Sequence, residues 1–179
     1  MGELRGPRIR GHCGRGRGRF HRRPAELADN NATSEQFVAE FLEKHKCEVL
    51  FQVHSIAPLL TVDELRRFTA EMDRGEHDCL LSTELIQIEC LHEGAPVNFT
   101  FDEKTNSQDL EPVQRVSWSV TAWRRAPFLD AARSGGCATN AGRVGTYPLG
   151  RAAAHVIKTE ADLALAEVML LLVERGELD

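Results

Sequence analysis

The chain has 179 residues, 42% of them hydrophobic, and a formal net charge of -5, which fits one globular domain and is short for two. The charge is unevenly distributed, because residues 1–23 contain eight arginines and a single acidic residue. The remaining chain is therefore strongly acidic, which argues against nonspecific nucleic-acid binding by the main domain.

The cysteines and the apolar segments indicate where the protein resides. The five cysteines include no C-x-x-C pair and lie mostly within apolar segments, as is typical of free thiols in a reducing compartment. The N-terminus has no apolar run that could form a signal-peptide core, and the longest apolar stretch, 168–173, is too short to span a bilayer. We expect a soluble, cytoplasmic protein with no membrane association.

Residues 1–22 are rich in Arg and Gly and are expected to be disordered. They could be an RNA-binding arm, a solvated tail, or a misassigned start translated out of phase from GC-rich DNA. We favour the third interpretation because the segment contains almost no aliphatic residues. Gly14, Gly16 and Gly18 do not predict a phosphate loop, since no strand precedes them and no helix follows. Residues 23–179 then form a partial globular domain.

The first predicted elements follow from apolar periodicity and helix caps. TSEQFVAEFLEKHK places Phe37, Val38, Phe41 and Leu42 on one helical face, and Thr33 or Ser34 can cap its start. The strand EVLFQV follows. T-x-x-E at Thr61 predicts a capping box that opens a helix through residue 72.

The second half of the chain continues the alternation of strands and helices. Predicted strands cover 79–85, 116–123, GRVGTYPL and HVIK, with a hairpin formed by 86–91 and 97–101 around Glu93–Gly94. Predicted helices cover 126–133 and 159–174. Strands separated by helices favour a mainly parallel α/β sheet. The last helix is apolar around much of its circumference, so we expect it to pack on the sheet or in a subunit interface.

Several segments occur in the same order as in a known family. RPAELA, the polar stretch with Ser34, FQ...S..PLLT, QDLEPV and IKTEADLALAE, from residue 23 to about 174, resemble the CMP-acylneuraminate synthetases. The resemblance implies a Rossmann-like nucleotidyltransferase fold with helices on both faces of the sheet and a β-hairpin excursion. It also implies Mg2+-dependent transfer of CMP from CTP to an acidic nonulosonic sugar such as a sialic acid, and a homodimer built around the hairpin.

The resemblance also assigns candidate binding residues. Arg23 and Ser34 match positions on the nucleotide side, and Gln52 matches a strand-end glutamine that faces the sugar acid. His54, two residues further on, is expected to line the sugar cleft. An amide at the carboxyl end of a parallel strand points into the crevice where ligands bind. The structural alternatives are that Arg23 braces a loop against Glu26 and that Ser34 only caps a helix.

Other positions depart from the family's pattern. The family's N-terminal A-R-x-x-S-K phosphate loop has no counterpart, so we expect the first strand or strands to be missing and assign no catalytic residue. Lys158 stands where the family has an acidic residue near Mg2+, and a lysine cannot bind that ion. Ser117–Trp118 and Thr121 replace an Asn-Gly pair and a Tyr on the sugar-facing strand, which predicts a remodelled pocket.

Two alternatives remain open. The chain is either a cytidylyltransferase or a truncated, noncatalytic domain that binds a sugar or a nucleotide. Separately, His77-x-Cys79 and Cys90-x-His92 could form a zinc site if their strands were adjacent. We favour buried structural cysteines with exposed histidines.

Overall fold

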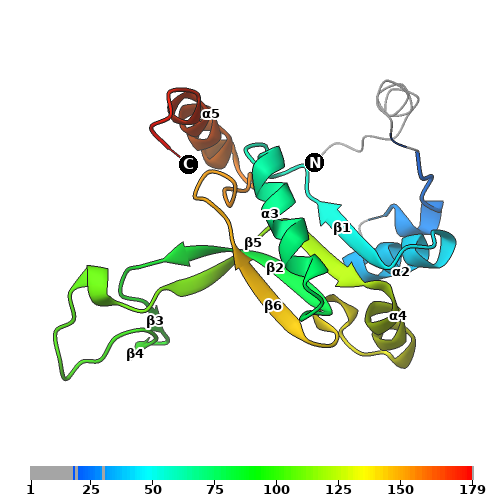
Figure 1. The fold of residues 1–179 in the computed structure, drawn as a ribbon, viewed down its shortest axis with the longest axis horizontal. Helices are drawn as coiled ribbons and strands as arrows, with labels where there is room; N and C mark the ends of the chain where they lie inside the picture. Colours follow the sequence, from blue (N-terminus) through cyan, green and yellow to red (C-terminus); the bar gives the residue numbers. More distant parts are fainter. Residues whose placement is uncertain (1–17, 19, 30, 179) are drawn as a thin grey trace.

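The computed structural model describes residues 18, 20–29 and 31–178 (Figure 1). The helices are α2 (Ser34–Lys44), α3 (Val62–Asp73), α4 (Arg125–Ser134) and α5 (Glu160–Glu174). The strands are β1 (Val49–Val53), β2 (Cys79–Ile86), β3 (Leu91–His92), β4 (Ala95–Pro96), β5 (Val113–Arg124) and β6 (Val144–Pro148). Short 3-10 turns lie at Ala25–Leu27, Ser107–Asp109 and Ala138–Asn140.

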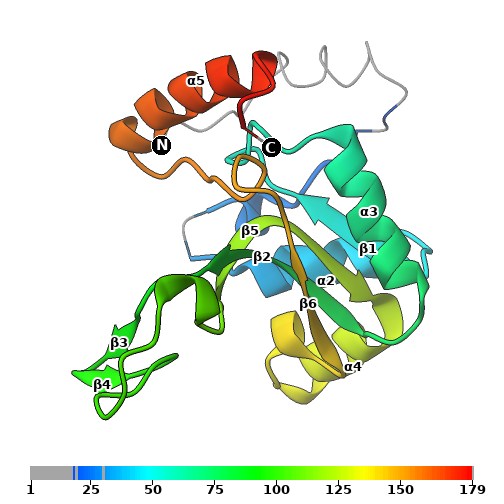
Figure 2. The ribbon, with the colours of Figure 1, turned by 60° about the vertical axis from the view of Figure 1, so that its left-hand side comes forward.

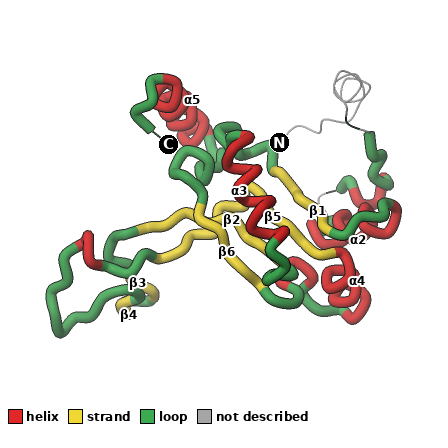
Figure 3. The backbone as a smooth tube through the Cα atoms, viewed as in Figure 1, coloured by secondary structure: helices red, strands yellow, loops and turns green. Residues whose placement is uncertain are grey.

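The central sheet has four strands in the order β1-β5-β2-β6 (Figure 3). β5 is antiparallel to both β1 and β2, and β2 is parallel to β6. Three strands, β1, β2 and β6, therefore run in one direction while β5 runs against them. The predicted α/β class is confirmed. Three of the four strands of this sheet run parallel to one another, and β5 is the antiparallel exception.

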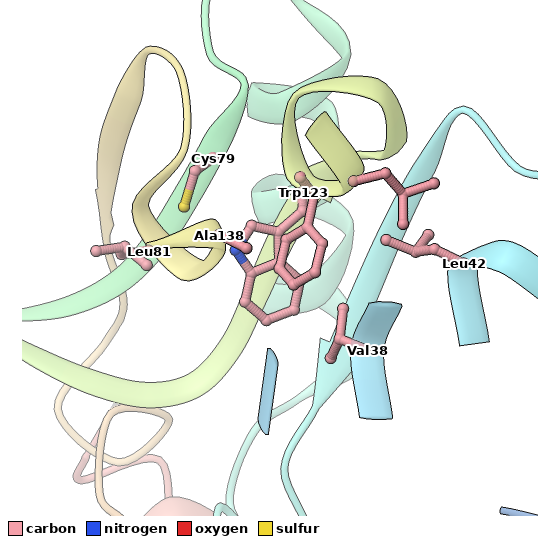
Figure 4. Packing of buried hydrophobic residues seen from close by; sticks show 8 residues of the cluster. Val38, Leu42, Cys79, Leu81, Trp123 and Ala138 are labelled. Atoms are coloured by element: carbon pink, nitrogen blue, oxygen red, sulfur yellow. The ribbon is translucent and has the colours of Figure 1, made fainter. Parts of the chain in front are cut away.

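Helices cover both faces of the sheet, as expected. On one face, Val38 and Leu42 of α2 pack with Trp123 of β5 and with Phe128 and Leu129 of α4 (Figure 4). The opposite face is covered by α3, whose Phe68 and Met72 are fully buried against the sheet. Two apolar layers therefore enclose the sheet.

Threonine hydroxyls cap three of the helices. Thr33, and not Ser34, caps α2, with a complete capping box to Gln36. Thr159 and Asp162 form the same arrangement at the start of α5. The predicted box at Thr61 forms only in part: its hydroxyl accepts from the Glu64 N–H, but the Glu64 carboxylate accepts from the Gly150 N–H at 2.9 Å. That bond ties the start of α3 to the loop after β6.

β2 and β5 continue beyond the helical layers as a projecting arm, which consists of residues 84–115 (Figure 2). At its end the hairpin is smaller than predicted, because β3 and β4 pair only two residues each. Residues 97–101 form no strand. Asn98 explains this difference, since its amide bonds the backbone of Ile88, Cys90 and Glu111 and holds the segment as a loop.

The C-terminal segment differs most from the sequence-based expectation. HVIK is not a strand: residues 149–159 form a loop that buries Ala152, Ala153 and Ala154. α5 follows this loop and lies away from the sheet in both ribbon views (Figures 1 and 2). The expectation that α5 packs on the sheet is therefore wrong. Only Ala166 and Met169 of this helix are buried, and Leu172 and Val173 are half-buried. Its exposed large apolar side chains are Leu163, Leu165, Val168, Leu170 and Leu171.

Part of the N-terminal segment contacts the globular domain. Residues 1–17 and 19 of the segment expected to be disordered lie outside the described residues. Within that segment, the His21 ring bonds the Glu40 carboxylate of α2 at 2.8 Å. In the described part of the chain, every helix is too short or too polar to cross a membrane.

Candidate functional site

The carboxyl ends of β1 and β2 lie at the same end of the sheet, on either side of β5. In open α/β sheets this end is where ligands bind. Gln52 is the last residue but one of β1 and pairs with Thr121 of β5. His54 is the first residue after β1, and its backbone N–H donates to the Ser119 carbonyl at 3.0 Å. The two residues that the sequence assigned to a sugar cleft thus share this end of β1.

A bulge in β5 shapes the same region. Leu81 pairs with Thr121 and Thr83 pairs with Val116, so β5 places extra residues between the two pairs. Trp118, in the middle of the bulge, has φ of +60°, a left-handed conformation that is uncommon for a bulky side chain. Such backbone strain clusters at functional sites. The bulge forms where the resemblance placed a changed sugar pocket.

Several buried hydroxyl groups lie at the bulge. Ser82 and Ser117 bond each other at 2.9 Å, and the Ser82 hydroxyl accepts from the Val120 N–H at 3.2 Å. Four buried polar atoms nearby have no hydrogen-bond partner among the described residues: His54 Nε2, Thr83 Oγ1, Ser119 Oγ and Thr121 Oγ1. Buried polar groups are normally paired. They come from the end of β1, the bulged part of β5 and the facing part of β2, and this place is the candidate site.

The electrostatics of the site are set by burial. Burial lowers the pKa of His54, because an apolar environment disfavours the charged imidazolium. His54 is therefore neutral near pH 7 and can both donate and accept a hydrogen bond. The side chain of Gln52 is half-buried and makes no hydrogen bond to the described residues. Its amide is free to bind a ligand.

The two predicted nucleotide-side residues lie before and at the start of α2, and no hydrogen bond among the described residues joins them to Gln52 or His54. Arg23 places its guanidinium 4.1 Å from the centroid of the Phe37 ring and donates to the Leu27 carbonyl at 3.4 Å. It thus braces a loop, although its partners are not Glu26. Ser34 is exposed in the first turn of α2. Their roles in nucleotide binding stay predictions.

The described residues do not offer a set of ligands for Mg2+. They include no group of three His, Cys, Asp or Glu side chains that could hold a metal ion. Lys158 is exposed, and its backbone N–H donates to Asp162 Oδ2 at 3.0 Å. That carboxylate is also occupied by the Thr159 N–H and hydroxyl. We therefore derive no step through a metal ion.

The zinc alternative is not supported by the described residues either. The Cys79 thiol donates to the Thr139 carbonyl at 3.1 Å, and burial raises its pKa to about 12. Cys79 is thus a protonated core thiol and not a thiolate ligand. Cys90 lies in the arm, where its thiol donates to the Ile88 carbonyl.

Sequence reasoning identified part of this site. It selected Gln52 and His54 at the strand end and noted Ser117–Trp118 and Thr121 as replacements. It missed the buried hydroxyls of Thr83 and Ser119 and the bulge itself. The alternation S-W-S-V-T was the available signal, since period two places Ser117, Ser119 and Thr121 on one face of an ideal strand.

Solved structures similar to this chain include the three that follow. The first is 4-diphosphocytidyl-2C-methyl-D-erythritol synthase from Anaerococcus prevotii, with a TM-score of 0.63 and 12% identity, covering 91% of this chain and 73% of that chain. The second is the bifunctional IspDF from Campylobacter jejuni, with a TM-score of 0.50 and 11% identity, covering 73% of this chain and 33% of that one.

The third is 2-C-methyl-D-erythritol 4-phosphate cytidylyltransferase from Thermus thermophilus, with a TM-score of 0.49 and 16% identity, covering 84% of this chain and 78% of that chain. No family model and no curated protein sequence matches this chain. At these identities the first two likenesses show the fold alone. The chain has the Rossmann-like α/β fold that the sequence predicted.

Proposed function

We propose that this chain is a cytidylyltransferase-like domain that binds CTP and a sugar at the carboxyl ends of β1 and β2. The observation that carries the proposal is the group formed by Gln52, His54 and the unpaired hydroxyls of the β5 bulge. It is supported by the fold shared with an enzyme whose name specifies a diphosphocytidyl product. A shared fold does not by itself determine function, so the site carries more weight than the likeness.

The chemistry of such a transfer depends on positioning. A sugar hydroxyl attacks the α-phosphorus of CTP, the bond from that phosphorus to the bridging oxygen breaks, and pyrophosphate leaves. Catalysis comes from holding the two reactants in line and from stabilising the phosphate charge. Gln52 and the neutral His54 are suited to hydrogen-bonding the sugar. We assign no group to the attack itself.

The acceptor is proposed from the sequence resemblance. RPAELA, PLLT and TEADLALAE point to an acidic nonulosonic sugar, whereas the similar solved structures are named for methylerythritol substrates or products. Both acceptor classes are sugars or polyols that carry an anionic group. We propose the nonulosonic acid, and the assay below includes both classes. Mg2+ belongs to the assay as an added ion, because it is usually held in part by substrate phosphates.

The decisive experiment is pyrophosphate release from CTP with and without Mg2+, using sialic, legionaminic and pseudaminic acids and 2-C-methyl-D-erythritol 4-phosphate as acceptors. We expect turnover with a nonulosonic acid, reduced about tenfold or more in Gln52→Ala by loss of a hydrogen bond to the sugar. Gln114→Ala is the matched control, since Gln114 is exposed on the arm.

Each other outcome has a defined meaning. Turnover only with the methylerythritol phosphate would retain the cytidylyl transfer and reject the nonulosonic acid. Calorimetric binding of CTP without turnover would establish the noncatalytic alternative. Neither binding nor turnover would reject the proposed function as a whole.

We also propose that the protein is a homodimer built around the arm and α5. The arm exposes Leu91, Val97 and Phe101, and α5 exposes Val168 and Leu171. Exposed apolar side chains gathered on two projecting parts favour an interaction surface. The arm is where the resemblance places the subunit contact.

A further inference from the structure

A cavity of about 330 Å³ lies beside α5, at the base of the arm. Its polar lining comes from Glu84 of β2, Arg115 of β5, and Arg151 and His155 of the loop before α5. An adjoining hollow of about 380 Å³ shares Glu84 and Arg151 and continues along β2. Cavities that bind small molecules have volumes of about 300–1,000 Å³, so each hollow is large enough for a small ligand.

The charges of this cavity are not balanced. Arg115 binds the Glu84 carboxylate through its Nε at 2.9 Å and through a second, closer nitrogen contact. Arg151 is exposed and makes no ion pair or hydrogen bond within the described ranges. The His155 Nε2–H donates to the Asp162 carbonyl at 2.9 Å, which leaves its Nδ1 as an acceptor. The Arg151 guanidinium therefore has no anionic partner among the described residues of the cavity.

The side of the cavity formed by α5 is apolar. Leu165, Met169 and Leu172 line it from α5, and their spacing of four and three residues places them on one stripe of the helix. Met169 is buried, whereas Leu165 is 51% exposed. A free guanidinium thus faces a space bounded by an aliphatic stripe, which is the arrangement that an amphipathic anion requires.

We propose that this cavity binds a small organic anion with an aliphatic tail. Its anionic group pairs with Arg151, and its tail lies along Leu165, Met169 and Leu172. None of the lining residues belongs to the group around Gln52 and His54. The inference is therefore independent of the proposed cytidylyl transfer, and either can fail without the other.

The test uses octanoate as the probe and titrates it into the full chain by calorimetry. We expect saturable binding of one octanoate per chain, weakened about tenfold or more in Arg151→Gln, because a charge-assisted bond is lost. Leu165→Ser, at a half-exposed position that leaves the core intact, should weaken the same binding. Arg133→Gln is the matched control, since Arg133 is exposed on α4 and bonds Glu43.

Three further ligands separate the sources of binding. Octanol carries the tail without the charge, and acetate and inorganic phosphate carry charge without the tail. We expect none of them to compete with octanoate at equal concentration. Equal binding of octanol, or octanoate binding unchanged in Arg151→Gln, would overturn the proposal as adsorption to the apolar helix. Equal binding of acetate or phosphate, or no octanoate binding in the millimolar range, would also overturn it.

Discussion

Burial at the end of β1 makes His54 sensitive to pH. Its pKa is lowered by burial, whereas in the unfolded chain a histidine titrates near 6.5. Below about pH 6.5 the unfolded chain binds a proton that the folded chain resists, so the free energy of unfolding falls. Above that pH the contribution of His54 is constant.

We therefore expect the stability of the protein to fall between pH 7.5 and pH 5.5 in urea unfolding, and His54→Gln to lose less over that interval than the parent. His92→Gln is the control, because His92 is exposed in the arm. The assignment to His54 is wrong if His54→Gln shows the same loss as the parent protein.

The residues of the candidate site differ in how far the sequence could predict them. Gln52 and His54 follow an apolar run, so the strand end places them with no tertiary information. The left-handed Trp118 could not be predicted, because no local rule favours that conformation for an aromatic residue. The resemblance put a glycine at this position, and Trp118 keeps a glycine-like φ. The sequence offers Thr33 or Ser34 as the cap of α2, and the structure selects Thr33.

Among the elements, β2 and β6 are joined at their starts by Asp78 and Arg143. The Asp78 carboxylate accepts from the Arg143 backbone N–H at 2.9 Å and from its Nε at 3.1 Å. The bond from the Arg143 side chain and that from its backbone lower the pKa of Asp78. These charge-assisted bonds fix the start of the β2–β6 pairing, just before Cys79 meets Val144.

We expect Asp78→Asn to reduce the free energy of unfolding by about 1–2 kcal/mol at pH 7. Because the folded pKa of Asp78 is lowered, its contribution is present above about pH 4 and is lost as the pH falls through the folded value. The difference between parent and variant in urea unfolding should therefore shrink in acid. Asp63→Asn is the control, since the Asp63–Arg66 pair is exposed and should contribute little. Equal effects of the two variants would contradict this role.

Elements with strong local signals were predicted well, and those set by distant contacts were not. α2 and α3 carry their own helical periodicity and N-caps, and β2 is an apolar segment; all three form close to the expected residues. HVIK has strand-like composition, but the Ile157 N–H donates to the Ile56 carbonyl of a distant loop, so the segment is held outside the sheet. The direction of β5 likewise depends on pairing between distant segments, which periodicity does not encode.

At the scale of the whole molecule, two parts extend from the layered core: the arm and α5 (Figures 1 and 2). An isolated apolar helix has little tertiary packing to stabilise it, and helices in proteins depend on such packing. The capping box at Thr159 supports the first turn only. The exposed apolar side chains of α5 are therefore the physical reason to expect a second copy at this helix in the proposed dimer.

We expect the protein to be a dimer at micromolar concentration by size-exclusion chromatography with light scattering. Leu171→Glu and Phe101→Glu place a charge where the exposed fractions are 52% and 72%, and each should shift the protein to monomer because burying an unpaired charge is costly. Val144→Glu is the matched control, since Val144 is 45% exposed at the start of β6, away from both parts. A monomeric parent protein would reject the dimer, and a dimer unaffected by Leu171→Glu would restrict the contact to the arm. The proposed dimer would bury Leu171, which is exposed, whereas Leu172 lines the anion cavity. Octanoate binding that survives in the monomeric variants would therefore show that each chain holds its own cavity.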